Sequence, residues 1–398
     1  MNGLSKKLIF YVSLLLWVLA LSRVGLTANE TMWDFEQYYY VAKADAAGLN
    51  SFRPEKTEKF IRKWESDTWL YPYFPPSVYF FRVFTYLPLN TSKYVYLFLK
   101  CIVLGYLFYM WQCAFLRDPG DPYFLVFCLF AFNATVYLDM RSGNVNLIEQ
   151  AFLWTAFYFF VRGKLAFFCA LLLVSSMWKI TPLVFSFLLL LGRRDRSVAF
   201  FFLATIVVVL ALSLLVYRSE IGSFLSTAHQ LARGLPDENI KNLSSLALIR
   251  SSIAKWSSFT GISLPWMFGI LTYVLFVIIV GIASWQSLRR LDMENSVDRE
   301  TAICLSCSVY AVTLPLFQDY QFILMLVPAY SLTMRLDLVK AFPVLFACFV
   351  LSARSSSSPG SIVFLDVFWD IFWNYYSLLV AFLVWILYIS WIRKTNSV

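Results

Sequence analysis

Runs of about 20 apolar residues recur along the chain, and they constrain its fold more than any other feature. The first, LIFYVSLLLWVLALSRVGLTA, begins at Leu8. A run of this length crosses the hydrocarbon core of a bilayer as one helix, and helices and closed barrels are the only structures that span lipid. Only 14% of the residues are charged, whereas soluble domains carry roughly 25%. The sequence therefore predicts an all-α, polytopic membrane protein with a single integral membrane domain over residues 1–398.

The apolar runs predict about twelve transmembrane helices. The first lies within residues 1–28 and is interpreted as a retained span, because it is long, contains Arg23 and lacks a small-residue cleavage site of the kind found in signal peptides. The other spans are expected near 94–116, 121–139, 145–161, 164–178, 180–192, 197–217, 265–288, 301–317, 320–334, 339–353 and 367–391.

Positive charge alternates from loop to loop. Loops on one side carry most of the cations, which the positive-inside rule assigns to the cytoplasm. Both termini are therefore expected to be cytoplasmic, in an inner or plasma membrane. Two long loops, 29–92 and 218–264, are expected on the external side, the first with helices that lie in the membrane interface. The cytoplasmic cations are Arg117, Arg162, Lys164, Arg193, Arg194, Arg196, Arg289, Arg290, Arg299, Arg335, Lys340, Arg393 and Lys394.

Six polar stretches gather on the external side of this topology. An ionisable group in or beside a membrane helix is a functional candidate by default, so these stretches are the candidate site. They contain Asp34 with Tyr38 and Asp45, residues 71–76, residues 141–146, residues 179–182, residues 242–250, and residues 318–321.

The stretch around Asp34 predicts a helix over residues 35–47. Asp34 is a candidate N-cap of this helix, with Gln37 in the reciprocal capping position. Helical spacing places Asp34, Tyr38 and Asp45 on one face. The neighbouring face is expected to lie on lipid and holds Phe35, Tyr39 and Ala42.

Structural interpretations compete with functional ones at the other stretches. Asn144 and Asn146 are placed to cap a helix, and Lys179 is placed to extend its ammonium group to the interface. The only histidine, His229, is interpreted as a solvent-facing residue of the second long loop. Cys304 and Cys307 form a C-x-x-C pair at helical spacing within an apolar run, which favours buried thiols over a redox or metal centre.

Several functional classes lack their signatures. The net charge of +9 is spread between apolar runs instead of forming one basic stripe, so a nucleic-acid partner is not expected. The sequence has no G-x-G-x-x-G, no P-loop, no H-E-x-x-H and no G-x-S-x-G. No cofactor and no metal are expected.

The order of the polar stretches resembles that of glycosyltransferase family 87, the polyprenyl-phosphate-sugar-dependent membrane glycosyltransferases with the GT-C fold. The resemblance rests on WDFEQYYYVA (33–42), YPYFPP (71–76), GNVNL (143–147), WKITP (178–182), NLSSLALIR (242–250) and QDYQFIL (318–324). It implies transfer of a hexose, most often mannose, from a polyprenyl phosphate carrier to a hydroxyl of a lipid or glycan at the outer face. Asp34 matches the acid that acts as general base, and Gln321 departs from the histidine of many members.

The residue types also suit this chemistry. Displacement at an anomeric carbon needs a base for the acceptor proton and a positive partner for the departing phosphate. Asp34 is the expected base, and Lys179 or Arg250 is the expected phosphate partner. Tyr38, Tyr71 and Tyr73 are expected to line the sugar site. The substrate-binding residues expected are Tyr38, Tyr71, Asn144, Asn146, Lys179, Arg250, Asp319, Tyr320 and Gln321.

Two alternatives remain open at the level of sequence. A polymerase or ligase of surface glycans uses polyprenyl diphosphate-linked glycan and needs similar external loops. A lipid or solute transporter would also be polytopic, but it is expected to show internal repeats and polar groups in the middle of its spans. In this sequence the polar groups gather on the expected external side of the membrane.

Overall fold

The computed structural model describes residues 3–48, 73–192, 196–216, 221–222, 242–349 and 371–395, and these contain helices and no strand. This confirms the predicted all-α class. The chain divides into two compact units. Unit 1 comprises residues 1–13, 115–136 and 238–398, and unit 2 comprises residues 14–114 and 137–237.

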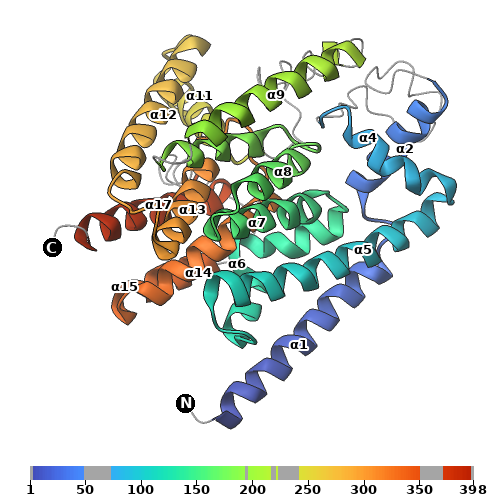
Figure 1. Ribbon diagram of the computed structural model, residues 1–398, viewed down its shortest axis with the longest axis horizontal. Helices are drawn as coiled ribbons and strands as arrows, with labels where there is room; N and C mark the ends of the chain where they lie inside the picture. Colours follow the sequence, from blue (N-terminus) through green and yellow to red (C-terminus); the bar gives the residue numbers. More distant parts are fainter. Residues whose placement is uncertain are drawn as a thin grey trace. The chain divides into compact units, whose positions relative to one another are not determined.

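Unit 2 contains the elements that carry the candidate site (Figure 1). Two short 3-10 helices and one π-helical turn interrupt its α-helices. Its elements are the second half of α1 (Gly3–Leu26), α2 (Trp33–Ala46), α4 (Ser77–Arg82), η1 (Val83–Tyr86), α5 (Leu89–Met110), the end of α6 (Pro122–Ser142), α7 (Asn146–Val161), α8 (Leu165–Ser175), η3 (Thr181–Leu190) and α9 (Arg196–Val216). The π-helical turn η2 (Trp111–Leu116) follows α5 and crosses into unit 1.

Unit 1 contains the first halves of α1 and α6 and the carboxy-terminal helices. Ser244 caps α11 by accepting a hydrogen bond from the Ala247 N–H, and Gly261, with φ of 70°, ends it, as expected of a side-chain N-cap and a left-handed C-terminal glycine. The elements are α11 (Ser245–Thr260), α12 (Trp266–Leu288), α13 (Ser296–Thr313), η4 (Asp319–Met325), α14 (Leu326–Arg335), α15 (Leu338–Phe349) and α17 (Tyr376–Thr395).

Among the described residues, five helices are long and apolar enough to cross a membrane. On α12, exposed apolar side chains recur at helical spacing through Leu271, Leu275, Ile279 and Ile282, which suits contact with lipid. The protein is therefore a polytopic membrane protein, and the number of twelve spans stays a prediction. The five helices are Ser5–Leu26, Leu89–Leu116, Pro122–Ser142, Trp266–Leu288 and Tyr376–Thr395, and shorter apolar helices cover Leu165–Ser175, Thr181–Leu190 and Ser197–Val209.

Helix α2 begins differently from the expectation. It starts at Trp33, and Met32 occupies the N-cap position with φ of 57° and no side-chain cap. The Met32 N–H donates to the Arg141 carbonyl oxygen at 2.8 Å, so a contact with the last turn of α6 fixes the start of the helix. The N-cap interpretation of Asp34 is therefore wrong, and Asp34 lies in the first turn.

The lipid-facing side assigned to α2 is also wrong. Phe35, Tyr39 and Ala42 are all buried. Phe35 stacks on Tyr96 of α5 with ring centroids 4.5 Å apart, and the Tyr39 hydroxyl donates to the Leu87 carbonyl oxygen at 2.8 Å. These aromatic side chains pack α2 into unit 2, because burial of large rings stabilises helix packing.

Gly143 lies in the short loop between α6 and α7, with φ of +71°. An added Cβ would lie 2.8 Å from the Phe35 Cβ and 3.2 Å from the Met32 Cβ. Glycine is therefore needed twice, for the left-handed backbone and for the close approach of α2. This approach brings the start of α2 against the residues that follow Gly143.

We expect Gly143→Ala to destabilise the protein by about 2–4 kcal/mol, since left-handed backbone strain adds to overpacking. Gly120→Ala is the matched control, because Gly120 also has positive φ, at +79°, but its Cβ would meet nothing within 4 Å. Denaturant unfolding in detergent measures both. Equal losses in the two variants would contradict the close approach at Gly143.

Candidate functional site

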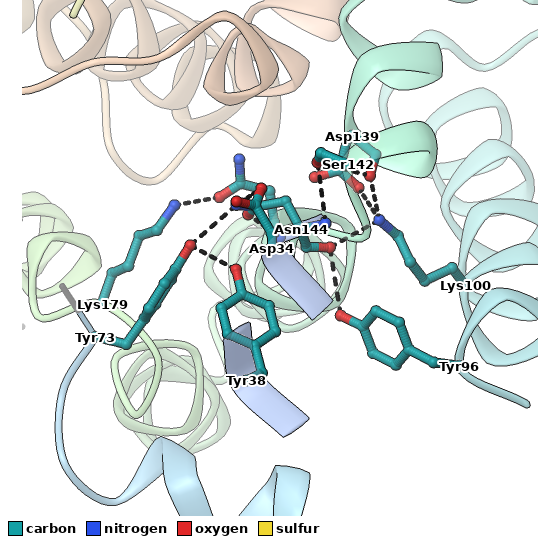
Figure 2. Close-up of polar contacts among 10 residues, drawn as sticks. Asp34, Tyr38, Tyr73, Tyr96, Lys100, Asp139, Ser142, Asn144 and Lys179 are labelled. Atoms are coloured by element: carbon teal, nitrogen blue, oxygen red, sulfur yellow. Dashed lines mark hydrogen bonds and ion pairs between the residues drawn. The ribbon is translucent and has the colours of Figure 1, made fainter. Parts of the chain in front are cut away.

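Four segments of unit 2 meet around the Asp34 carboxylate (Figure 2). They are the first turn of α2, the residues before α4, the loop from α6 into α7, and the residues between α8 and η3. Four of the stretches expected to form a site lie in these segments, although the chain separates them widely. The residues brought together are Asp34, Tyr38, Tyr73, Asn144, Asn146 and Lys179.

Asn144 is the centre of the hydrogen-bond network. Its Nδ2 donates to Asp34 Oδ2 and to the Tyr73 hydroxyl, both at 2.9 Å. Its Oδ1 accepts from the Asn146 N–H at 3.1 Å, at the start of α7, and its own N–H donates to Ser142 Oγ at 3.1 Å. The N-cap of α7 is Val145, without a side-chain cap, so the capping interpretation of Asn144 and Asn146 is wrong. The Asn144 side chain bonds the first residue of α7 from the position before the cap and is fully buried.

Two tyrosines cover one side of the carboxylate. The Tyr38 hydroxyl donates to the Tyr73 hydroxyl at 2.6 Å, and both rings are buried. The Phe74 N–H donates to the Trp178 carbonyl oxygen at 3.1 Å, which fixes the Tyr73 segment beside the residues before η3. Tyr71, also expected in the site, lies outside the described residues.

A buried ion pair holds the loop that carries Asn144. Lys100 Nζ lies 2.6 Å from Asp139 Oδ1, and both side chains are fully buried. The same ammonium donates to the carbonyl oxygens of Asp139 at 2.6 Å and Asn144 at 2.7 Å. The Tyr96 hydroxyl also donates to the Asn144 carbonyl oxygen, at 3.3 Å. Charge-assisted hydrogen bonds of this kind are strong and directional, so Lys100 fixes the position of the loop.

The environment of Asp34 has opposing effects on the pKa of its carboxyl group. Burial raises the pKa of this carboxyl group above its ordinary value of 3.8. Hydrogen bonds from Asn144 and Ser142, and the charges of Lys100 and Lys179, act in the opposite direction. Burial is the largest of these effects, so Asp34 is a stronger base than an exposed aspartate. Its side chain remains partly accessible.

Lys179 forms the other charged edge of the site. Its ammonium group donates to Asn146 Oδ1, lies 3.8 Å from Glu149 Oε2 and lies 5.7 Å from the centroid of the Tyr73 ring. Burial lowers the pKa of Lys179, and the nearby carboxylates act against this shift. Lys179 therefore does not extend into the interface as a surface anchor would, since its side chain is only 13% exposed.

The remaining expected residues lie in unit 1. Asn242 Oδ1 accepts from the Phe317 N–H at 3.1 Å, and the Leu243 N–H donates to the Phe317 carbonyl oxygen. These bonds join two of the stretches that carry the resemblance, one leading into α11 and the other into η4. The residues concerned are Arg250 on α11, and Asp319, Tyr320 and Gln321 on η4.

Gln321 has a structural role at the start of η4. Its Oε1 accepts from the Gln318 N–H at 2.7 Å, and the two glutamines form a reciprocal capping box. The Tyr320 hydroxyl donates to Gln318 Oε1. The Gln321 amide is therefore engaged in capping. His229, expected to face solvent, lies outside the described residues.

Three site residues were missed by the sequence analysis: Lys100, Asp139 and Glu149. Each lies inside a predicted span, at 94–116, 121–139 or 145–161. The available signal was charge within an apolar run, because an ionisable residue in such a run is expensive to bury and is usually paired. Within the described chain, no three or more His, Cys, Asp and Glu side chains group as a metal centre requires.

Helices long enough to span a bilayer define a polytopic membrane protein, and its unit 2 holds a cluster of hydrogen-bonded polar side chains around Asp34. The sequence profile of glycosyltransferase family 87 matches residues 69–315, more than half of the 398-residue chain, and the chain belongs to this family. The protein is therefore a membrane glycosyltransferase. The match begins after Asp34 and ends before Asp319. Comparison with curated proteins and comparison with solved structures each gave no match.

We expect Lys100→Met to lower the free energy of unfolding by about 3–5 kcal/mol, because it leaves the buried Asp139 carboxylate uncompensated. Adding Asp139→Asn should recover part of this loss. Lys6→Met is the control, since the Lys6–Asp118 pair is exposed and is worth less than about 1 kcal/mol. Denaturant unfolding in detergent measures all four proteins. Equal losses of unfolding free energy in Lys100→Met and Lys6→Met would contradict the role of the buried Lys100–Asp139 pair.

Proposed function

We propose that this glycosyltransferase moves a hexose, mannose in the first instance, from a polyprenyl phosphate carrier to a hydroxyl of a lipid or glycan acceptor. The proposal includes a GT-C fold and a site on the external face of the cell membrane, with both termini cytoplasmic. Its main support is the Asp34 carboxylate, which is desolvated, held by Asn144 and still partly accessible.

The proposed reaction is a single displacement. Asp34 takes the proton of the acceptor hydroxyl as that oxygen bonds to the anomeric carbon. The bond from the anomeric carbon to the phosphate oxygen breaks, and the polyprenyl phosphate leaves with the electron pair. The configuration at the anomeric carbon is inverted. A positioned base contributes about 10²–10⁴-fold to such a step.

Each neighbour of Asp34 has a role in the proposal. Asn144 orients the Asp34 carboxylate and stabilises its ionised form by donating a hydrogen bond. Tyr38 and Tyr73 line the site of the sugar. Lys179 or Arg250 is the cation offered to the departing phosphate, where positive charge stabilises the transition state. Tyr71, Asp319, Tyr320 and Gln321 are also proposed as substrate-binding residues.

Asp34→Asn should lower transfer by at least about 100-fold, because the amide keeps the shape of the side chain and removes the base. Asp45→Asn is the matched control on the same helix, three turns further along. Purified proteins are assayed for release of radiolabelled mannose from polyprenyl phosphate-mannose, and polyprenyl diphosphate-linked glycan serves as the competing donor. Retained turnover in Asp34→Asn would show that Asp34 is not the base. Turnover of only the diphosphate-linked donor by the wild-type protein would favour a polymerase or ligase.

The raised pKa of Asp34 predicts the acid side of the pH profile. Only the carboxylate accepts a proton, so kcat/KM should fall as pH decreases through a value above 3.8. Ser142→Ala removes a hydrogen bond that lowers this pKa, and it should move the acid limb to higher pH. Initial rates across about pH 4–8 test both statements. A limb at the same or lower pH in Ser142→Ala would contradict this electrostatic account.

A further inference from the structure

The first turn of α7 carries two buried polar side chains, Asn146 and Glu149, that have no role in the proposed displacement. Asn146 and Glu149 are 1% and 3% exposed. They are three residues apart, so they lie on the same face of the helix. Lys179 contacts both of them, at Asn146 Oδ1 and at 3.8 Å from Glu149 Oε2. The two side chains and the ammonium group form one polar surface beside the Asp34 network.

Lys179 fixes the orientation of the Asn146 amide. An ammonium group only donates hydrogen bonds, so the amide oxygen must face Lys179 and the amide nitrogen must point elsewhere. Within the described part of the chain, Asn146 Nδ2 is buried and has no hydrogen-bond partner. Its two N–H groups are therefore an unused donor.

Glu149 supplies the complementary atom. Its Oε2 is buried and accepts no hydrogen bond from any described residue, because the 3.8 Å to Lys179 Nζ is longer than a hydrogen bond. The carboxylate is thus an unused acceptor. It also balances the Lys179 charge, so this surface offers a donor and an acceptor with little net charge.

Buried polar groups in folded proteins are almost always hydrogen-bonded, so a ligand with complementary groups is suited to these two atoms. A phosphate group offers acceptors only and would be repelled by Glu149. A sugar hydroxyl both donates and accepts, and a hexose ring is neutral. We infer that Asn146 Nδ2 and Glu149 Oε2 bind hydroxyl groups of the transferred hexose. This inference rests on the proposed function and names the sugar end of the site, with Glu149 as a binding residue.

The inference predicts a loss of sugar discrimination in specific variants. In the wild-type protein, monodeoxy forms of methyl α-mannopyranoside, taken one hydroxyl position at a time, include at least one that binds about tenfold more weakly than the parent sugar. In Glu149→Gln and in Asn146→Leu, the parent sugar should bind about tenfold more weakly than in wild type. The difference in affinity between the parent sugar and its deoxy form should become smaller. Polyprenyl phosphate without sugar should bind Glu149→Gln at least as well as wild type, because a carboxylate is removed.

Two control variants separate binding from folding. Gln150→Leu removes a buried amide from the same helix, where Gln150 Oε1 accepts from Trp154 Nε1 at 3.1 Å. Glu300→Gln removes a buried carboxylate from an ion pair with Arg117 in unit 1. Both should keep the discrimination between parent and deoxy sugars. Denaturant unfolding is measured for every variant, so that a general loss of structure is recognised.

The experiment uses the full-length protein in detergent, with saturation-transfer NMR for the methyl mannosides and a filter-binding assay for the polyprenyl phosphates. Unchanged discrimination in both site variants would overturn the inference, even if polyprenyl phosphate-mannose is turned over. Equal weakening of mannoside and of sugar-free polyprenyl phosphate would also overturn it. If no polyprenyl donor is used but mannoside binding still depends on Glu149, the proposed function fails and the hydroxyl site stands. If wild type binds no mannoside, the inference fails.

Discussion

The buried pair of Lys100 and Asp139 is the interaction on which the site depends. Lys100 also donates to the carbonyl oxygens at both ends of the loop from Asp139 to Asn144. A buried pair of this kind contributes little to net stability, because desolvation offsets much of the attraction. Its value here is positional. It fixes the backbone of Asn144, and Asn144 in turn holds Asp34 and Tyr73, so one ammonium group determines where the carboxylate lies.

The same arrangement sets the chemical character of Asp34. A base in such a site must be desolvated enough to accept a proton and still be ionised before the reaction. Burial supplies the first condition, and the Asn144 and Ser142 hydrogen bonds with two nearby cations supply the second. Asp34 and Glu149 differ in their partners: Asp34 accepts a hydrogen bond from the neutral Asn144 amide, whereas Glu149 faces the Lys179 ammonium group at 3.8 Å. This difference suits one base and one binding group.

The sequence predicted the all-α membrane class and the proximity of Asp34, Tyr38, Tyr73, Asn144, Asn146 and Lys179, because motif order and the expected side of the membrane are carried by local patterns. It did not predict the start of α2, which is fixed by a bond from Met32 to the Arg141 carbonyl. It did not predict the burial of Phe35, which depends on the close approach at Gly143. It did not predict the pairing of Lys100 with Asp139, because this pair joins two different helices and each residue lies in an apolar span.

The account predicts a single displacement with one carboxylate as base. The most direct test is the anomeric configuration of the product, determined by NMR after transfer from a polyprenyl phosphate-hexose of known configuration. A single displacement predicts inversion, because the acceptor oxygen attacks opposite to the departing phosphate. Retention of configuration would exclude attack from the side opposite to the departing phosphate and would contradict the account.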